Sequence, residues 1–138
     1  MLNDESRINI TDLIGNDDNC YSIKRVYSDN GDLSLVQVLD NRGRIYKCLF
    51  YNEDGLLSNQ SVYDSKTGKE VMNITYRCDG KTISSVREYN LDTQQLMSVT
   101  FYKGDGKSPS SIIEYNDDGS DAQFSLFCDD GEVITQCI

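Results

Sequence analysis

A short motif that ends in glycine recurs along this chain and constrains its fold more than any other feature. In each copy an aromatic residue or leucine is followed, after three or four residues, by glycine or, once, by glutamine. The copies are YSDNG, LDNRG, YNEDG, YDSKTG, YRCDG, YNLDTQ, YKGDG, YNDDG and FCDDG. Their lead residues, 27, 39, 51, 63, 76, 89, 102, 115 and 127, lie 12 or 13 positions apart. Such a fixed period predicts a repeat architecture.

Turn chemistry identifies the repeating unit as a hairpin. In Asn52-Glu53-Asp54-Gly55, Asn and Asp suit the first and third positions of a type I turn, and glycine can close a bulged hairpin in the left-handed conformation. Gln94 stands in the glycine position of its own copy. Roughly eight residues remain between turns, the length of an ordinary strand. We therefore expect an all-β fold: an antiparallel β-meander of tandem hairpins of about 25 residues, curled or half-barrel in shape.

The two edges of such a sheet can be assigned from the sequence. Consecutive turns of a meander lie at opposite ends of its strands, so alternate motifs share an edge. One edge is predicted to carry Gly31, Gly55, Gly80, Gly106 and Gly131. The other is predicted to carry Gly43, Gly68 and Gly119.

The two faces of the sheet can be predicted from the period-two alternation of strands. The residues expected on the same face as the tyrosines are Leu33, Ile45, Leu57, Ile83 and Leu96. Those expected on the opposite face are Val36, Cys48, Val86, Val99, Ile112 and Phe124. Both faces are partly apolar, so the sheet is expected to curl over itself or to pack its second face. Whether it closes into a barrel stays open.

The two ends of the chain depart from the repeat. Residues 1–20 lack the motif, and Ile10, Leu13 and Ile14 ahead of Gly15 suit a short helix. We expect residues 1–20 to form an N-terminal cap and residues 21–138 to form the hairpin-repeat domain. The final EVITQCI is expected to be a strand with a free edge, which allows a monomer or an edge-strand dimer.

Charge and cysteine content limit the partners and the compartment. With 23 acidic and 13 basic residues the formal net charge is −10, which disfavours nucleic acids and anionic membranes and favours a basic partner. No segment resembles a signal peptide or a membrane span, so a cytoplasmic location is expected. The cysteines are odd in number and form no CxxC pair, so free thiols are expected. They are Cys20, Cys48, Cys78, Cys128 and Cys137.

Catalysis is not expected of this chain. It contains no histidine, which removes the commonest general base and most zinc sites. The pairs Asp17-Asp18, Asp117-Asp118 and Asp129-Asp130 offer oxygen ligands for calcium, but their spacing differs from a calcium loop and suits turns. We therefore expect no metal and no cofactor. The regularly spaced tyrosines suit cross-strand packing, with a carbohydrate or peptide platform as the alternative.

The motifs YNEDG, YDSKTGKE, YRCDGKTISSVREYN and YKGDGKSPSSIIEYN resemble the hairpin repeats of small bacterial proteins of unknown function, well known in phytoplasmas. The chain is also similar, more distantly, to the MORN-type repeats of some bacterial antitoxins, although it lacks their Tyr-Gly-Asn signature. The resemblance covers roughly residues 25 to 131 and implies the hairpin architecture.

Two functions follow as hypotheses. The first is an immunity protein or antitoxin that neutralises a basic toxin, for which a nuclease is one candidate, through an acidic turn edge. Its predicted partner-binding residues are Asp54, Asp79, Asp105, Asp129 and Asp130. The alternative is a secreted effector that binds a host protein through an exposed sheet face or strand edge.

Overall fold

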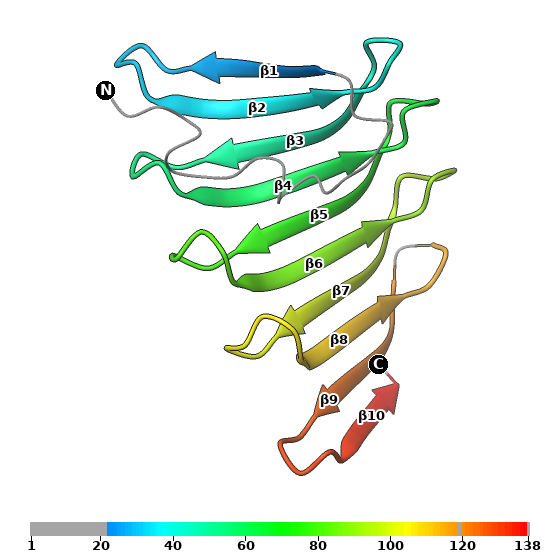
Figure 1. The fold of residues 1–138 in the computed structure, drawn as a ribbon. Helices are drawn as coiled ribbons and strands as arrows, with labels where there is room; N and C mark the ends of the chain where they lie inside the picture. Colours follow the sequence, from blue (N-terminus) through cyan, green and yellow to red (C-terminus); the bar gives the residue numbers. More distant parts are fainter. Residues whose placement is uncertain (1–21, 119, 138) are drawn as a thin grey trace.

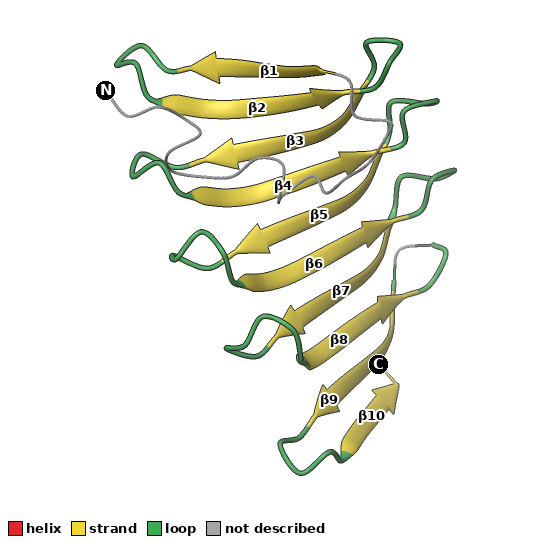
Figure 2. Cartoon of the chain, in the orientation of Figure 1, coloured by secondary structure: helices red, strands yellow, loops and turns green. Residues whose placement is uncertain are grey.

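The protein, seen here as a computed structural model, is described at residues 22–118 and 120–137. These residues form ten β-strands and no helix (Figure 2). The strands are β1 Ser22–Tyr27, β2 Leu33–Leu39, β3 Ile45–Tyr51, β4 Leu57–Tyr63, β5 Glu70–Tyr76, β6 Ile83–Tyr89, β7 Leu96–Tyr102, β8 Pro109–Tyr115, β9 Asp121–Phe127 and β10 Val133–Cys137. The cap predicted for residues 1–20 and the turn residue Gly119 lie outside the described residues.

The ten strands make one open sheet. They are hydrogen-bonded in the order of the sequence, β1 to β10, and each strand pairs antiparallel with its chain neighbours (Figure 1). The predicted all-β meander is therefore confirmed, and this sheet does not close into a barrel. Its strands rotate progressively from β1 to β10 in Figure 1, as the right-handed twist of strands requires.

The turns follow the predicted chemistry. Seven motif glycines have positive φ, from +69° to +91°, and Gln94 adopts the same conformation with φ 65°. In the turn after β3, the Gly55 N–H donates to the Asn52 carbonyl at 3.0 Å. The Oδ1 of Asn52 accepts from the N–H groups of Asp54 and Leu56, both at 3.0 Å. A polar side chain at the start of the turn thus satisfies donors that the hairpin leaves unpaired.

The turns alternate between the two edges of the sheet. We call one edge the five-turn edge; it holds the turns at 28–32, 52–56, 77–82, 103–108 and 128–132. The other is the four-turn edge, with the turns at 40–44, 64–69, 90–95 and 116–120. In Figure 1 they lie on the left and on the right. The sequence-based assignment of glycines to edges is confirmed for every motif glycine that the structure describes.

Turn side chains also bond to the strand ends of the neighbouring hairpin on the same edge. On the five-turn edge the guanidinium of Arg77 donates to the Tyr102 carbonyl at 2.8 Å. On the four-turn edge the side-chain amide of Gln94 donates to the Glu70 carbonyl at 3.1 Å. The partners are 24 and 25 residues apart, about one hairpin. Each hairpin is therefore joined to the next through its turns as well as its strands.

The prediction of strand faces was wrong, because the lead residues alternate between the two faces. Directly paired residues share a face, so the pairs Ile74↔Val86 and Tyr76↔Ile83 place all four side chains on one face. Tyr89 instead shares the other face with Val99, which pairs with Arg87. The reason is a register shift beside each of the first eight turns, which inserts one extra residue and reverses the alternation within the strand.

The tyrosine column is therefore divided between the two faces. Tyr51, Tyr76 and Tyr102 end strands at the five-turn edge and lie on one face, whereas Tyr63, Tyr89 and Tyr115 lie on the other. Residues six positions before a lead residue lie opposite it, contrary to prediction. Residues three positions before a lead residue also lie opposite it, but the set predicted for one face is itself divided, because Val36 pairs with Leu49 and its neighbour Gln37 pairs with Cys48. The extra residue of the bulge lies between the positions six and three before a lead residue, so it changes the face of the earlier residue and not of the later one.

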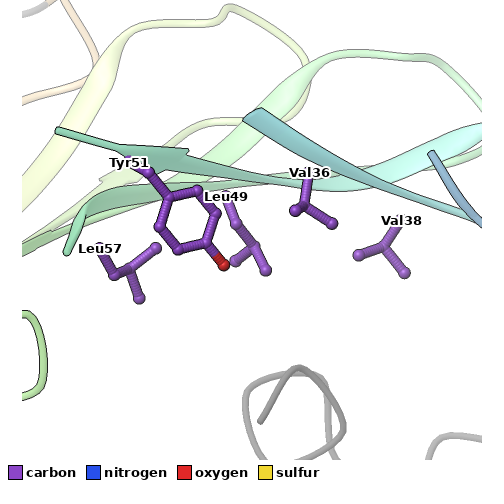
Figure 3. Close-up of a cluster of buried hydrophobic side chains, with 5 residues drawn as sticks. All are labelled: Val36, Val38, Leu49, Tyr51 and Leu57. Carbon is purple, nitrogen blue, oxygen red and sulfur yellow. The ribbon is translucent and has the colours of Figure 1, made fainter. Parts of the chain in front are cut away.

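The core lies on one face of β2, β3 and β4. Its buried side chains are Val36, Val38, Leu49, Tyr51 and Leu57, which project from the same side of the ribbon (Figure 3). Leu49 is 0% exposed and Leu57 is 1% exposed. Burying side chains of this size contributes roughly 1.5–3 kcal/mol each. We call this side of the sheet the core face and the other side the opposite face.

Candidate functional site

The five aspartates predicted to bind a partner all lie on the five-turn edge. Asp54 is in the turn between β3 and β4, Asp79 between β5 and β6, and Asp105 between β7 and β8. Asp129 and Asp130 are in the turn between β9 and β10. Because turns on one edge recur once per hairpin, residues about 25 positions apart in the chain are brought into one row.

Two of these carboxylates are used inside their own turns. The Oδ1 of Asp105 accepts from the Lys107 and Ser108 N–H groups at 2.9 and 2.8 Å, and its Oδ2 accepts from the Ser108 hydroxyl at 2.6 Å. Asp79 makes the same three bonds with Lys81 and Thr82. These side chains hold the turn in shape, as Asx turns do.

The same bonds change the acidity of both groups. The Thr82 hydroxyl, with the N–H groups of Thr82 and Lys81, lowers the pKa of Asp79 to about 2. The Ser108 hydroxyl and neighbouring N–H groups likewise lower the pKa of Asp105 to about 2. Hydrogen bonds donated to a carboxylate favour its charged form. Both residues therefore keep their negative charge well into the acidic range.

The other three aspartates differ in how much of the carboxylate is available. Asp130 accepts one bond, from the Glu132 N–H at 2.9 Å. Asp129 accepts from the Lys103 ammonium at 2.9 Å, and its side chain is 99% exposed. In the described part of the chain, the carboxylate of Asp54 accepts no hydrogen bond, because Asn52 holds that turn. Asp54 thus presents its full charge to solvent, whereas the exposed charge of Asp129 is shared with Lys103.

The acidity of the five-turn edge exceeds that of the other edge. Its turns contain nine acidic residues and four basic ones, a balance of −5. The turns of the four-turn edge contain five acidic and four basic residues, a balance of −1. Half of the net charge of −10 is therefore carried by the turns of one edge. Such an arrangement attracts a positively charged surface and repels a negative one.

A groove on the four-turn edge was not anticipated from the sequence. It has a volume of about 630 Å³ and lies between the turns at 40–44 and 64–69, with Arg44, Cys48, Tyr63 and Lys66 in its lining. Burial raises the pKa of the Cys48 thiol, so this sulfur is a poor nucleophile. Cys48 and Tyr63 are 15 positions apart in the sequence and are brought together by strand register, which no local motif reveals.

The described residues contain no cluster of three or more acidic, cysteine or histidine side chains that could hold a metal ion. The four cysteines in this part of the chain are Cys48, Cys78, Cys128 and Cys137, and all are free thiols. Within the same residues there is no helix of the length and hydrophobicity needed to span a membrane.

The turn carboxylates predict a defined response to acid. Because their pKa of about 2 lies below the ordinary value of 3.8, Asp79 and Asp105 stabilise the fold fully above pH 3.8 and lose this contribution as the pH falls towards 2. We expect the double variant Asp79→Asn and Asp105→Asn to lose less thermal stability over this interval than the unmodified protein. Asparagine keeps an acceptor oxygen but does not titrate. The measurement is Tm by circular dichroism across the pH range.

A matched control for this experiment is the double variant Asp54→Asn and Asp117→Asn. In the described residues neither carboxylate accepts a hydrogen bond, so this variant should follow the unmodified protein through the acid transition. If the two double variants show the same acid profile, the turn bonds of Asp79 and Asp105 do not stabilise the folded state.

Solved structures with a similar fold come from larger proteins. The GtfA/B complex bound to UDP and GlcNAc matches with a TM-score of 0.59 and 17% identity, over 84% of this chain and 23% of that one. A mutant of S. aureus TarM in complex with fondaparinux, α-GlcNAc-glycerol and UDP matches with a TM-score of 0.57 and 11% identity, over 86% and 22%. The pneumococcal O-GlcNAc transferase GtfA, with UDP and GlcNAc, matches with a TM-score of 0.56 and 14% identity, over 91% and 22%.

At these identities the likeness shows the fold alone, and this chain spans less than a quarter of each of those proteins. No curated protein matches the sequence significantly. The profile of one family, described as a protein of unknown function, DUF2963, matches residues 50–100 and 79–123. Together these matches span residues 50–123, more than half of the chain, from the end of β3 to the start of β9. The chain therefore belongs to the DUF2963 family of proteins of unknown function.

Proposed function

We propose that this protein is a non-catalytic, cytoplasmic binding module that neutralises a basic toxin, as an immunity protein or antitoxin does. The observation that carries the proposal is the row of acidic turns on the five-turn edge, with its balance of −5. Acidic rows of this kind speed the capture of a basic partner by electrostatic steering. A basic nuclease is a suitable target, because its own active site must attract a polyanion.

Two further features support this function. The chain has no histidine, and its buried thiol at Cys48 has a raised pKa, so the described residues offer little for acid-base or nucleophilic catalysis. The hairpin motifs resemble those of phytoplasma repeat proteins and, more distantly, the MORN-type repeats of antitoxins. A rigid meander with charged turns is a suitable scaffold for covering an active site.

Within the acidic row, Asp54 and Asp129 are the residues expected to contribute most to recognition. Their carboxylates are not needed for the bonds inside their own turns, whereas both oxygens of Asp79 and of Asp105 are used there. Asp54 can therefore form an ion pair with a partner at little cost to the fold. Asp129 can do so by exchanging its exposed ion pair with Lys103, which contributes little stability in water. Removing one member of a hydrogen-bonded charge pair at an interface weakens the free energy of binding by roughly 2–5 kcal/mol.

The test is neutralisation in co-expression. A growth-inhibiting basic protein encoded beside the gene for this chain is expressed with it, and growth is expected to recover. The double charge reversal Asp54→Lys and Asp129→Lys should abolish the recovery and weaken the complex at least tenfold. In the unmodified pair, affinity should fall as salt is raised from ~50 to ~500 mM, because screening weakens steering.

The matched control is the double reversal Asp92→Lys and Asp117→Lys on the four-turn edge. Both double variants bring the net charge from −10 to −6, since each substitution adds two positive charges. The control variant should still neutralise the toxin. Equal loss in both variants would show that net charge alone matters, and failure to neutralise any neighbouring toxin would refute the proposal and favour an exported effector that binds a host protein.

A further inference from the structure

Within the described residues, β10 is the outermost strand at one end of the sheet. All five residues of β10 are exposed, from Val133 to Cys137. β10 pairs with β9 on one side, and no described strand pairs with its other side. Alternate residues of an edge strand direct both their N–H and C=O groups away from the sheet, so β10 offers a row of unused backbone donors and acceptors.

None of the usual protections of an edge strand is present in β10. Its sequence, VITQC, contains no charged residue and no proline, and its pairing with β9 shows no register shift. β9 and β10 together contain a single charged residue, Asp121. In a chain with 26% charged residues, these two strands carry little charge. The acidic turn that joins them lies at one end of β10, so two antiparallel β10 strands keep their acidic turns at opposite ends of the contact.

β1, the outer strand at the other end of the sheet, differs from β10 in each of these respects. β1 contains Lys24 and Arg25, and its pairing with β2 shows a register shift between Val26 and Tyr27. Charges and bulges of this kind hinder the addition of a further strand. Head-to-tail addition of β1 to β10 is therefore disfavoured, whereas pairing of β10 with its own copy involves only unprotected edges.

Exposed apolar side chains lie on the opposite face of the sheet, in a row that leads from β10 back to β7. Phe101, Leu126 and Ile134 follow one row of the register, through the pairs Phe101↔Ser111, Ser111↔Leu126 and Leu126↔Ile134. Their exposed fractions are 37%, 40% and 52%. Leu126 and Ile134 are direct neighbours, and Ser111 separates them from Phe101. Adjacent exposed apolar side chains beside an unpaired strand edge indicate a contact surface more strongly than isolated ones do.

We propose that this protein self-associates through β10, as a dimer in which the β10 strands of two copies pair antiparallel across a two-fold axis. A register centred on Thr135 pairs Val133 with the second copy's Cys137 and Ile134 with the second copy's Gln136. Each pair joins residues of the same face, since residues two and four positions apart in a strand share a face. The Ile134 side chains of the two copies are then diagonal neighbours across the contact, and the symmetric contact closes at two copies.

The dimer is expected to be weak, because a five-residue strand contributes a contact smaller than a standard interface. We expect a dissociation constant on the order of 10 μM, just beyond the micromolar end of the range found for standard-sized interfaces. Sedimentation equilibrium of the full chain should then show species of 15.6 and 31.2 kDa, one and two copies of the 15.6 kDa chain. Raising the salt concentration should leave the dimer intact or strengthen it, because it screens the repulsion between two chains of charge −10.

A substitution at the edge tests which surface forms the dimer. Ile134→Lys places a charge on the unprotected strand and should weaken the dimer at least tenfold. Ile134 is 52% exposed, so the variant should remain folded, which its circular dichroism and Tm will verify. The matched control, Val26→Lys in β1, adds the same charge in place of a β-branched apolar residue at the other edge and should leave the dimer unchanged.

A disulfide trap tests the register. In the background Cys78→Ser, which removes the exposed thiol of a turn, Val133→Cys should form two symmetric disulfides with the second copy's native Cys137. Paired residues in adjacent strands lie within the range of Cα separations that a disulfide spans. The corresponding control, Lys24→Cys in the same background, should cross-link much more slowly.

Three results would overturn the proposal: a monomer at ~200 μM, well above the expected dissociation constant, an Ile134→Lys variant that dimerises as well as the unmodified chain, or equal cross-linking of the two cysteine variants. These results leave the proposed capture of a basic toxin untouched, because that function uses the five-turn edge and is weakened by salt. The two proposals can therefore fail separately.

Discussion

Replacing Leu49 with alanine is expected to lower the free energy of unfolding by about 3 kcal/mol, within the range of 2–5 measured for buried leucines. Leu49 is 0% exposed and lies at the centre of the core face, among Val36, Tyr51 and Leu57. The substitution removes buried methyl groups and leaves a cavity that a hydrogen-bonded sheet cannot fully close. Urea denaturation monitored by circular dichroism measures the change.

Leu91→Ala is the control for this prediction. Leu91 lies in a turn of the four-turn edge and is 41% exposed, so the same chemical change should alter the free energy of unfolding by no more than about 0.5 kcal/mol. Comparable losses at the two positions would show that the cluster around Leu49 is not the core of the protein.

Gly106→Ala is expected to destabilise the protein by about 2–4 kcal/mol, against about 1 kcal/mol for Gly68→Ala. Both glycines have positive φ, +69° and +76°, so both substitutions cause similar backbone strain. They differ in their surroundings. A Cβ at position 106 would lie 2.8 Å from Cγ2 of Thr82 and 3.0 Å from the Ile83 backbone nitrogen, whereas a Cβ at position 68 would have no atom within 4 Å.

A double-mutant cycle with Thr82→Ser isolates the steric part of this effect. Serine keeps the hydroxyl that Asp79 accepts from but removes the methyl group that the new Cβ would contact. Gly106→Ala should therefore cost less in the Thr82→Ser background than in the unmodified protein. If Gly106→Ala and Gly68→Ala prove equally destabilising, the turns at 77–82 and 103–108 are not packed against each other as described.

The local features of the fold could be predicted from the sequence because they depend on short-range chemistry. The turns were found from residues such as Asn52 and Gly55, and even Gln94 adopts the left-handed conformation expected at its position. The assignment of turns to edges then follows from the connectivity of a meander. None of these steps requires knowledge of how strands pair in detail.

The faces of the strands could not be predicted, because a period-two count assumes an uninterrupted strand. A single extra residue beside each of the first eight turns, such as Ser84 between Ile83 and Ser85 in the pairing with β5, moves the start of the strand to the other face. Its position depends on the register of the neighbouring strand. The groove that contains Cys48 and Tyr63 depends on the same long-range pairing and was missed for the same reason.

The candidate site was predicted as a row but not in its detail. All five aspartates lie on one edge, as the spacing of the motifs implies. Which carboxylates remain available depends on a hydroxyl residue three positions further on, Thr82 after Asp79 and Ser108 after Asp105. This signal was present in the sequence as DGKT and DGKS, since a hydroxyl at that position competes for the carboxylate.

The alternation of lead tyrosines between the two faces limits how a sheet of this kind can change in length. Duplicating one strand with its turn, 12 or 13 residues, would reverse the direction of every strand beyond it and transfer its core side chains to the other face. Duplicating two strands preserves both direction and face, because the pattern repeats once per hairpin. Growth or loss of such a protein is therefore compatible with its packing only in whole hairpins, and insertions of odd strand number are excluded by geometry.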